Sequence, residues 1–169
     1  EPAVRAHLPV LVSKLSKLVG PDGPVNLAMT TNGATMRLVA DSLKQAGLKR
    51  VNISLDTLDR TKFHQMTRRD ELNNVLDGIR AAQEVGFDPV KINAVIERGT
   101  NDDELIDLAT FGREQNVEVR FIEFMPLDAE GHWMNGKVVG QEEIVEKINA
   151  VYPVEVLPAR GAAPADRFR

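Results

Sequence analysis

Polar side chains that could bind a small molecule directly follow several short apolar runs of the sequence. One apolar run leads into Thr30-Thr31-Asn32-Gly33, a second ends at Ser54-Leu55-Asp56, and a third ends at Glu123-Phe124-Met125-Pro126. In parallel α/β folds, ligands bind at the carboxyl ends of the strands and in the loops that follow them. If these runs are parallel strands, their hydroxyl, amide and carboxylate groups surround one rim.

The apolar residues fall into alternating helix and strand patterns. Helical spacing covers residues 4–18, 34–46, 72–85, 102–115 and 141–151. Short runs rich in Val, Ile, Leu or Phe cover residues 25–29, 51–55, 90–96 and 119–124. Three helices stop at signals for a left-handed C-cap, namely Gly47-Leu48, Gly86-Phe87 and Asn116-Val117. This alternation predicts an α/β fold with a parallel sheet, as a section of an α/β barrel or of a doubly wound sheet.

The predicted strands have one apolar and one polar face. The polar parity carries Thr30, Asn52, Ser54, Lys91 and Asn93. Parallel sheets covered by helices are usually apolar on both faces. Because the apolar faces must meet the helices, the polar ones converge inside, where burial is costly unless something fills and pairs them. We therefore expect a lumen that holds a ligand; an open antiparallel sheet with a wet face is disfavoured by the helical crossovers.

The sequence does not decide the partner of Lys91 or the orientation of the last predicted strand. Lys91 lies inside its apolar run, and a lysine within a sheet is rare without a partner. That partner is either a neighbouring acidic residue or an anionic or carbonyl-bearing ligand, and spacing does not decide between them. In the last run, Arg120 lies on one parity, with Glu123 and Met125 on the other, so its orientation is ambiguous.

The remaining polar groups have structural explanations. Asn101-Asp102-Asp103-Glu104 could bind a metal or act in acid–base chemistry, but it is better explained as a helix N-cap with a glutamate three residues on. The histidines lack ligand spacing and are expected at the surface; they are His7, His64 and His132. The sequence contains neither a Walker loop nor a dinucleotide-binding fingerprint.

Composition and charge narrow the function classes. The 169 residues suit one domain, and with 43% hydrophobic but only 5% aromatic residues the core must be aliphatic. A net charge of −4 gives no electrostatic footprint for nucleic acid or an anionic membrane. The absence of cysteine removes disulfides, thiolate metal sites and cysteine-held iron–sulfur clusters from this chain. It is compatible with a reducing compartment, and we expect a cytoplasmic protein.

Taken in order, the rim motifs resemble the molybdenum cofactor biosynthesis protein A family. The resemblance covers nearly the whole chain, from Glu1 to about Val151. Its blocks are Thr30-Thr31-Asn32-Gly33, Ala46-Gly47-Leu48, Arg50 to Asp59, Val90 to Val95, Arg98 to Glu104 and Arg120 to Pro126, followed by Trp133. Each block is modest alone, but together and in this order they are highly specific.

The resemblance implies a radical S-adenosylmethionine lyase, GTP 3′,8-cyclase. Such an enzyme forms (8S)-3′,8-cyclo-7,8-dihydroguanosine 5′-triphosphate from GTP, the first step of molybdenum cofactor (molybdopterin) biosynthesis. A 5′-deoxyadenosyl radical takes hydrogen from the ribose C3′, which then attacks C8 of the base. The implied fold is an incomplete (β/α)6 barrel of parallel strands and outer helices over residues 1–151. Residues 152–169 are then a short strand and a Pro/Ala-rich linker.

The resemblance also implies cofactors, partners and site residues. The cofactors are S-adenosylmethionine and two 4Fe–4S clusters, and the protein partners are the next enzyme of the pathway, which forms cyclic pyranopterin, and a second copy in a homodimer. Thr30 and Lys91 match positions that hold GTP, so the nucleotide becomes the implied partner of Lys91. Ser54 and Met125 match S-adenosylmethionine contacts, and Glu1-Pro2 resembles the end of a Gly-Gly-Glu-Pro motif that seats its amino group. Weaker candidates lining the lumen are Asn32, Asn93 and Glu123.

The cysteine count departs from the resemblance. The family carries three cysteines near each end for its clusters, and this chain has none. We therefore expect the chain to be the central part of such an enzyme, inactive alone, with a Cys-x3-Cys-x2-Cys motif encoded upstream of Glu1. One alternative is a non-catalytic nucleotide-binding module that kept the lumen. Another is a radical S-adenosylmethionine enzyme that modifies peptides or haem precursors, which the run from Arg120 to Pro126 disfavours.

Overall fold

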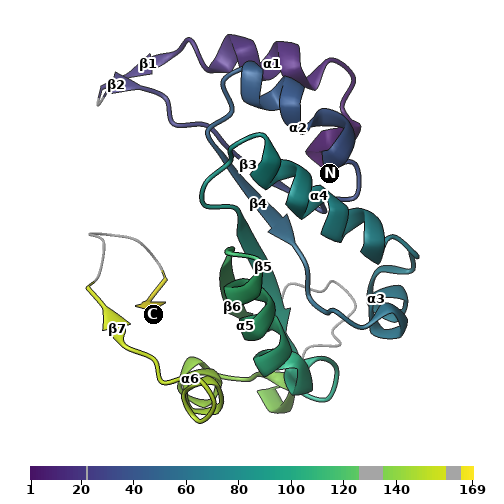
Figure 1. Cartoon of the computed structure of the whole chain (residues 1–169), viewed down its shortest axis with the longest axis vertical. Coiled ribbons are helices and arrows are strands. Elements are labelled where there is room, and N and C mark those ends of the chain that lie inside the picture. The colour runs from purple at the N-terminus through teal and green to yellow at the C-terminus, as the bar shows by residue number, and fades with distance from the viewer. Residues whose placement is uncertain (22, 126–134, 159–164) are drawn as a thin grey trace.

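A parallel four-stranded sheet with strand order β3-β4-β5-β6 organises the chain (Figure 1). The computed structural model describes residues 1–21, 23–125, 135–158 and 165–169. Pro126, His132, Trp133 and most of the expected linker lie outside these described residues. The strands of the sheet are β3 (Ala28–Thr31), β4 (Arg50–Ser54), β5 (Lys91–Ile96) and β6 (Glu118–Glu123).

Helices alternate with these strands, as predicted for a parallel α/β fold. They are α1 (Leu8–Leu15), α2 (Met36–Gln45), α3 (Arg60–Thr67), α4 (Leu72–Glu84), α5 (Leu105–Glu114) and α6 (Gln141–Asn149). The short 3-10 helices are η1 (Pro2–Val4), η2 (Asp102–Glu104) and η3 (Asn135–Lys137). Two small antiparallel pairs join β1 (Val19–Gly20) to β2 (Gly23–Pro24) and β7 (Val156–Leu157) to β8 (Arg167–Phe168).

The sequence prediction differs from the structure at the edges of elements. The first helix, predicted over residues 4–18, is the shorter α1 preceded by η1, and the first strand of the sheet begins at Ala28 instead of residue 25. The pattern did not predict α3 or the pairing of β1 with β2, whereas β7 lies in the segment where the resemblance implied a short strand. Among the described residues, no helix is both long and apolar enough to span a membrane.

Three helices end as their C-cap signals predict. The left-handed residues Gly47, Gly86 and Asn116 have φ angles of 101°, 85° and 52°. The apolar residue after each of them is buried and donates its N–H back into the helix, to the carbonyl oxygens of Leu43, Ala82 and Gly112. Each cap therefore turns the chain sharply toward the strand that follows.

The sheet is covered by helices on one face. Val51 and Ile53 of β4 and Ile92, Ala94 and Ile96 of β5 are completely buried. They pack with apolar residues of α1, α2 and α4 in one cluster and of α5 and α6 in a second. The side chains of opposite parity are exposed or half-buried, so the predicted division into an apolar and a polar face is confirmed.

Helix α4 approaches the loop after β3 most closely at Gly78. A Cβ atom on Gly78 would lie 2.3 Å from the carbonyl oxygen of Gly33 and 2.9 Å from the Cβ of Met36. Gly33 itself has a φ of 77°, and it closes the polar loop that begins at Thr31. The missing side chain therefore lets α4 support the rim of the sheet directly.

We predict that Gly78→Ala destabilises the complete protein. Alanine in place of glycine normally stabilises a helix by about 1 kcal/mol, but overpacking against a backbone carbonyl costs about 1–3 kcal/mol. The urea midpoint should fall. Gly112→Ala in α5 is the comparison variant, because its Cβ would meet a side-chain methyl of Val119 at 2.7 Å and a backbone oxygen, that of Val117, only at 3.3 Å, and it should cost less. A Gly78→Ala variant at least as stable as the parent would contradict this packing.

Candidate functional site

The polar face of the sheet carries its side chains in two rows that run across the strands. The register joins the first row as Thr30, Asn52, Lys91 and Glu118. It joins the second row as Ser54, Asn93 and Arg120. Neighbouring strands lie about 4.8 Å apart, and residues two apart along a strand are separated by about 6.6 Å. The two rows are thus close enough for ligands bound to them to touch.

Within the first row, Lys91 has an acidic partner. Its Nζ forms an ion pair with Oε1 of Glu118, the same oxygen that accepts a hydrogen bond from Nε of Arg120 at 3.3 Å. Burial alone would raise the pKa of Glu118, but the hydrogen bonds and charges of Lys91 and Arg120 bring it below its usual value. Among the described residues, two cations share one carboxylate here, so the group of Lys91, Glu118 and Arg120 carries one net positive charge.

This pairing supplies one of the two partners that spacing allowed for Lys91, a neighbouring acidic residue. The resemblance implied a nucleotide as the partner of Lys91, but the structure also provides a carboxylate, that of Glu118. The sequence analysis did not identify this glutamate. The only indication in the sequence is that Glu118 and Arg120 are two residues apart, which places both side chains on the same face of β6. At the other end of the row, Asn52 Nδ2 donates to Thr30 Oγ1 at 3.3 Å.

The orientation of β6 is now defined. Arg120 pairs with Asn93 and so belongs to the polar face, whereas Glu123 pairs with Ile96, whose parity faces the helices. The Oε1 atom of Glu123 accepts the backbone N–H of Gln141 at the start of α6, at 2.8 Å. Glu123 therefore has a structural partner, and Arg120 is the residue of β6 that lies in line with Ser54 and Asn93.

At the rim beyond β3, Glu1 fixes the polar loop. Its carboxylate accepts hydrogen bonds from Thr31 Oγ1 at 2.7 Å and from the backbone N–H of Asn32 at 2.6 Å. Burial would raise the pKa of Glu1, but these hydrogen bonds and that of the Ala3 N–H lower it overall. Asn32 Oδ1 in turn accepts the N–H of Ala34 at 3.1 Å. The loop that carries Asn32 is thus held by an ionised carboxylate.

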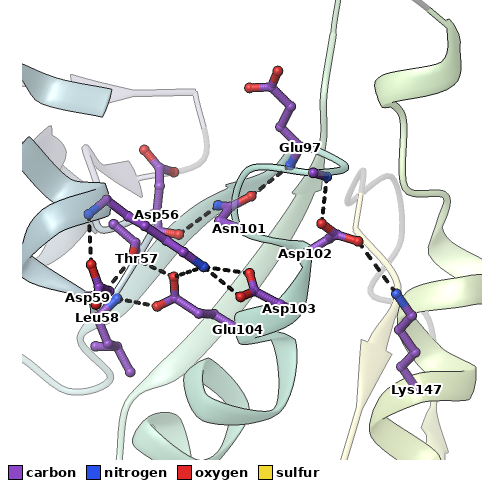
Figure 2. Close-up of polar contacts among 12 residues, drawn as sticks. Asp56, Thr57, Leu58, Asp59, Glu97, Asn101, Asp102, Asp103, Glu104 and Lys147 are labelled. Atoms are coloured by element: carbon purple, nitrogen blue, oxygen red, sulfur yellow. Dashed lines mark hydrogen bonds and ion pairs between the residues drawn. The ribbon is translucent and has the colours of Figure 1, made fainter. Parts of the chain in front are cut away.

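At the rim beyond β4 and β5, Asn101 occupies the N-cap position of η2 as predicted, but its side chain makes no capping hydrogen bond. Its completely buried carboxamide instead donates to the carbonyl oxygens of Asp56 and Val95 and accepts the N–H of Glu97. Figure 2 shows the bonds to Asp56 and Glu97. Glu104 is also buried and binds the loop after β4 instead of its own helix. Backbone groups of other segments need these partners, and they compete successfully with the local cap.

The other candidates lie near the same rim or outside it. Ser54 is exposed at the carboxyl end of β4, and Met125, two residues beyond β6, is 49% exposed. Asp56 lies two residues after Ser54; its burial raises the pKa of its carboxyl group, although its hydrogen bond from the N–H of Val95 partly offsets this. His7 and His64 are exposed, as predicted.

The residues suit a polar organic ligand better than a metal. The described residues contain no group of three or more His, Cys, Asp or Glu side chains placed to hold an ion. The sequence has no cysteine, so these 169 residues supply no thiolate for an iron–sulfur cluster. Hydroxyl, amide and cationic groups on the two rows do fit a nucleotide or a nucleoside-containing cofactor.

Comparison with known proteins identifies the class. Residues 1–112 match the Radical SAM superfamily, and the chain belongs to that superfamily. A solved structure of TYW1 with a lysine-pyruvate adduct bound has a TM-score of 0.68 and 15% sequence identity. The alignment covers 95% of this chain and 50% of that one. The fold is therefore part of a radical-SAM barrel, and the choice between a barrel section and a doubly wound sheet is settled.

Curated relatives are more specific. The chain is 44% identical over 170 residues to GTP 3′,8-cyclase of Moorella thermoacetica, covering 100% of this chain and 51% of that protein. It is 42% identical to GTP 3′,8-cyclase 1 of Mycobacterium tuberculosis, covering 99% of this chain and 47% of that protein. The chain thus spans about half the length of the curated relatives it matches, and the resemblance in the rim motifs is confirmed.

We predict that Glu118→Gln destabilises the protein in a pH-dependent way. A carboxyl group whose pKa is lowered by folding stabilises the protein above its unfolded pKa of about 4.3, and this contribution is lost as the pH falls through the folded value. Urea midpoints of variant and parent should therefore differ near pH 7 and converge on acidification. Glu114→Gln, at an exposed position of α5, is the control. A difference that does not change with pH would contradict the ion pairing.

Proposed function

We propose that the complete protein is a GTP 3′,8-cyclase that converts GTP to (8S)-3′,8-cyclo-7,8-dihydroguanosine 5′-triphosphate, the first step of molybdenum cofactor biosynthesis. Identity of 42–44% to GTP 3′,8-cyclases over nearly the whole chain supports this, and one structural observation carries it. That observation is the pair of polar rows on a sheet face that an ordinary barrel would fill with apolar side chains. We propose residues 1–151 as the partial barrel and residues 152–169 as a short strand and linker.

GTP binds the first row in this proposal. Thr30 and Asn52 offer a hydroxyl and an amide, which suit the hydroxyl and carbonyl groups of a nucleoside. Lys91 of this row and Arg120 of the second row share Glu118, and the one net positive charge of these three side chains suits a phosphate oxygen. Glu118 keeps Lys91 and Arg120 side by side. In this proposal the nucleotide binds next to the existing ion pair, so Lys91 has both Glu118 and GTP as partners.

S-adenosylmethionine binds the second row and the rim just beyond it. Ser54 offers an exposed hydroxyl, and Met125 lies two residues past the end of β6. Weaker candidates are Asn93, which pairs in register with Ser54, and Asn32, whose backbone N–H is held by Glu1. Glu123 is not among them, because its parity faces the helices. When bound and reduced by an iron–sulfur cluster, S-adenosylmethionine supplies the 5′-deoxyadenosyl radical. The role of this chain is to hold the GTP ribose against that cofactor, which the separation of about 6.6 Å between rows permits.

The clusters themselves need ligands from outside these 169 residues, since the chain has no cysteine. We therefore propose that the chain alone does not perform the reaction. We also propose a cytoplasmic location, homodimer formation and a functional partnership with the enzyme that forms cyclic pyranopterin. A non-catalytic nucleotide-binding module is the alternative that the missing cysteines favour. A Cys-x3-Cys-x2-Cys motif in the reading frame upstream of Glu1 would support the cyclase, and a natural gene without it would support the module.

We predict that Lys91→Ala and Ser54→Ala separate the two ligands in the complete protein. Lys91→Ala should weaken GTP binding about tenfold or more, because a charge-assisted hydrogen bond contributes about 1.5–3 kcal/mol, while S-adenosylmethionine binding stays within about twofold. Ser54→Ala should do the reverse. Isothermal titration calorimetry measures both affinities.

Lys14→Ala, at an exposed position of α1, is the control for loss of a lysine charge and should change neither affinity. Lys91→Ala with parental affinity for GTP would refute the assignment of Lys91. Equal losses of both ligands in either variant would mean that the rows do not divide the ligands.

A further inference from the structure

The described residues contain four buried polar or charged side chains, and three of them belong to one network behind the rim. Thr57 is 1% exposed, Asn101 0% and Glu104 6%. The fourth, Thr31, belongs to the loop fixed by Glu1. Buried polar groups are costly unless they are fully paired, and apolar residues would fill the same space without that requirement. The network therefore calls for a reason beyond packing.

Glu104 ties the loop after β4 to η2. Its Oε1 accepts the hydroxyl of Thr57 at 2.7 Å, and its Oε2 accepts the backbone N–H of Leu58 at 2.8 Å (Figure 2). The Nζ of Lys62 lies 3.1 Å from Oε1 of Glu104 and binds the exposed carboxylate of Asp103 at 2.6 and 2.7 Å, so the two carboxylates share one ammonium group. The hydroxyl of Thr57 also accepts the N–H of Asp59 at 3.0 Å. One buried carboxylate thus fixes the successive residues Thr57 and Leu58.

Asn101 ties the same loop to the end of β5. Its Nδ2 donates to the carbonyl oxygens of Asp56 at 2.7 Å and Val95 at 2.9 Å, and its Oδ1 accepts the N–H of Glu97 at 2.9 Å. The carboxamide is thus bonded through both its nitrogen and its oxygen (Figure 2). Asn101 therefore links the loop after β4 to the end of β5, where the backbone hydrogen bonds between these two strands have ended.

The strand pairing shows why such links are needed. The registered pairing of β4 with β5 stops at Ser54 and Asn93, and the last ladder bond is from Leu55 N–H to the carbonyl oxygen of Asn93. Beyond this point side chains replace the ladder, since Asp56 Oδ1 accepts the N–H of Val95. The strand end that presents Ser54 is therefore held on its loop side by Thr57, Asn101 and Glu104.

We infer that Thr57, Asn101 and Glu104 are positioning residues that set the S-adenosylmethionine contact at Ser54 without touching either ligand. This inference rests on the proposed cofactor site at Ser54. Thr30 and Lys91 lie within the paired parts of their strands, so the GTP row is held independently of the network. The network therefore acts on one ligand only.

The test compares Thr57→Val with Thr57→Ser in the complete, cluster-loaded protein. Valine keeps the shape of threonine and removes the hydroxyl bonded to Glu104, whereas serine keeps that hydroxyl. Thr57→Val should weaken S-adenosylmethionine binding about tenfold and leave GTP binding within about twofold, measured by isothermal titration calorimetry. Thr57→Ser should restore the parental affinity. Asp107→Asn is the control, because Asp107 is exposed in the adjoining helix α5 and takes no part in the network, and it should change neither affinity.

Three outcomes would overturn the inference: Val and Ser variants that bind S-adenosylmethionine alike, parental affinity in Thr57→Val, or equal losses of both ligands. If Thr57→Val does not fold, Glu104→Gln removes the charge while keeping the size, and the same selective loss is expected of it. Ser54→Ala is measured alongside. Unchanged S-adenosylmethionine binding in Ser54→Ala would overturn the proposed cofactor site and the inference together. A loss in Ser54→Ala without one in Thr57→Val would overturn the inference alone.

Discussion

The alternation of side chains along β4 and β5 is the constraint on which the rest of the structure depends. Burial of Ile53 and Ile92 against the helices forces Ser54, Lys91 and Asn93 to the opposite face. A slip of one residue in register would bury the polar set and expose the apolar one, which makes the register strongly specified. The candidate binding face is thus a direct consequence of how the core is built.

The two ends of this face are held by different interactions. Backbone ladders align the row that includes Thr30 and Lys91, and an ion pair with Glu118 keeps Lys91 within that row. The rim beyond Ser54 depends on buried side chains instead, because the ladder between β4 and β5 has ended there. Backbone hydrogen bonds between strands form with almost any side chains, whereas a buried polar network depends on particular residues. The two ligands are accordingly expected to respond to different substitutions.

Sequence patterns predicted what depends on local spacing. The alternation within β4 and β5 identified Lys91 and Ser54 as residues of the polar face, and the caps located the ends of α2, α4 and α5. Glu118 was missed as the partner of Lys91, since the pairing register of β5 with β6 is not encoded in either segment. Asn101 was predicted as a helix cap because local spacing cannot show that distant carbonyl groups need its carboxamide.

The central claim is that the polar face of the sheet holds both ligands of the complete protein, in two adjacent rows. A crystal structure of that protein with GTP and S-adenosylmethionine bound tests this most directly. The account predicts GTP in hydrogen-bond contact with Thr30 and Lys91, and S-adenosylmethionine in contact with Ser54 at the carboxyl end of β4. Either ligand bound away from this face, or the two positions exchanged, would contradict it.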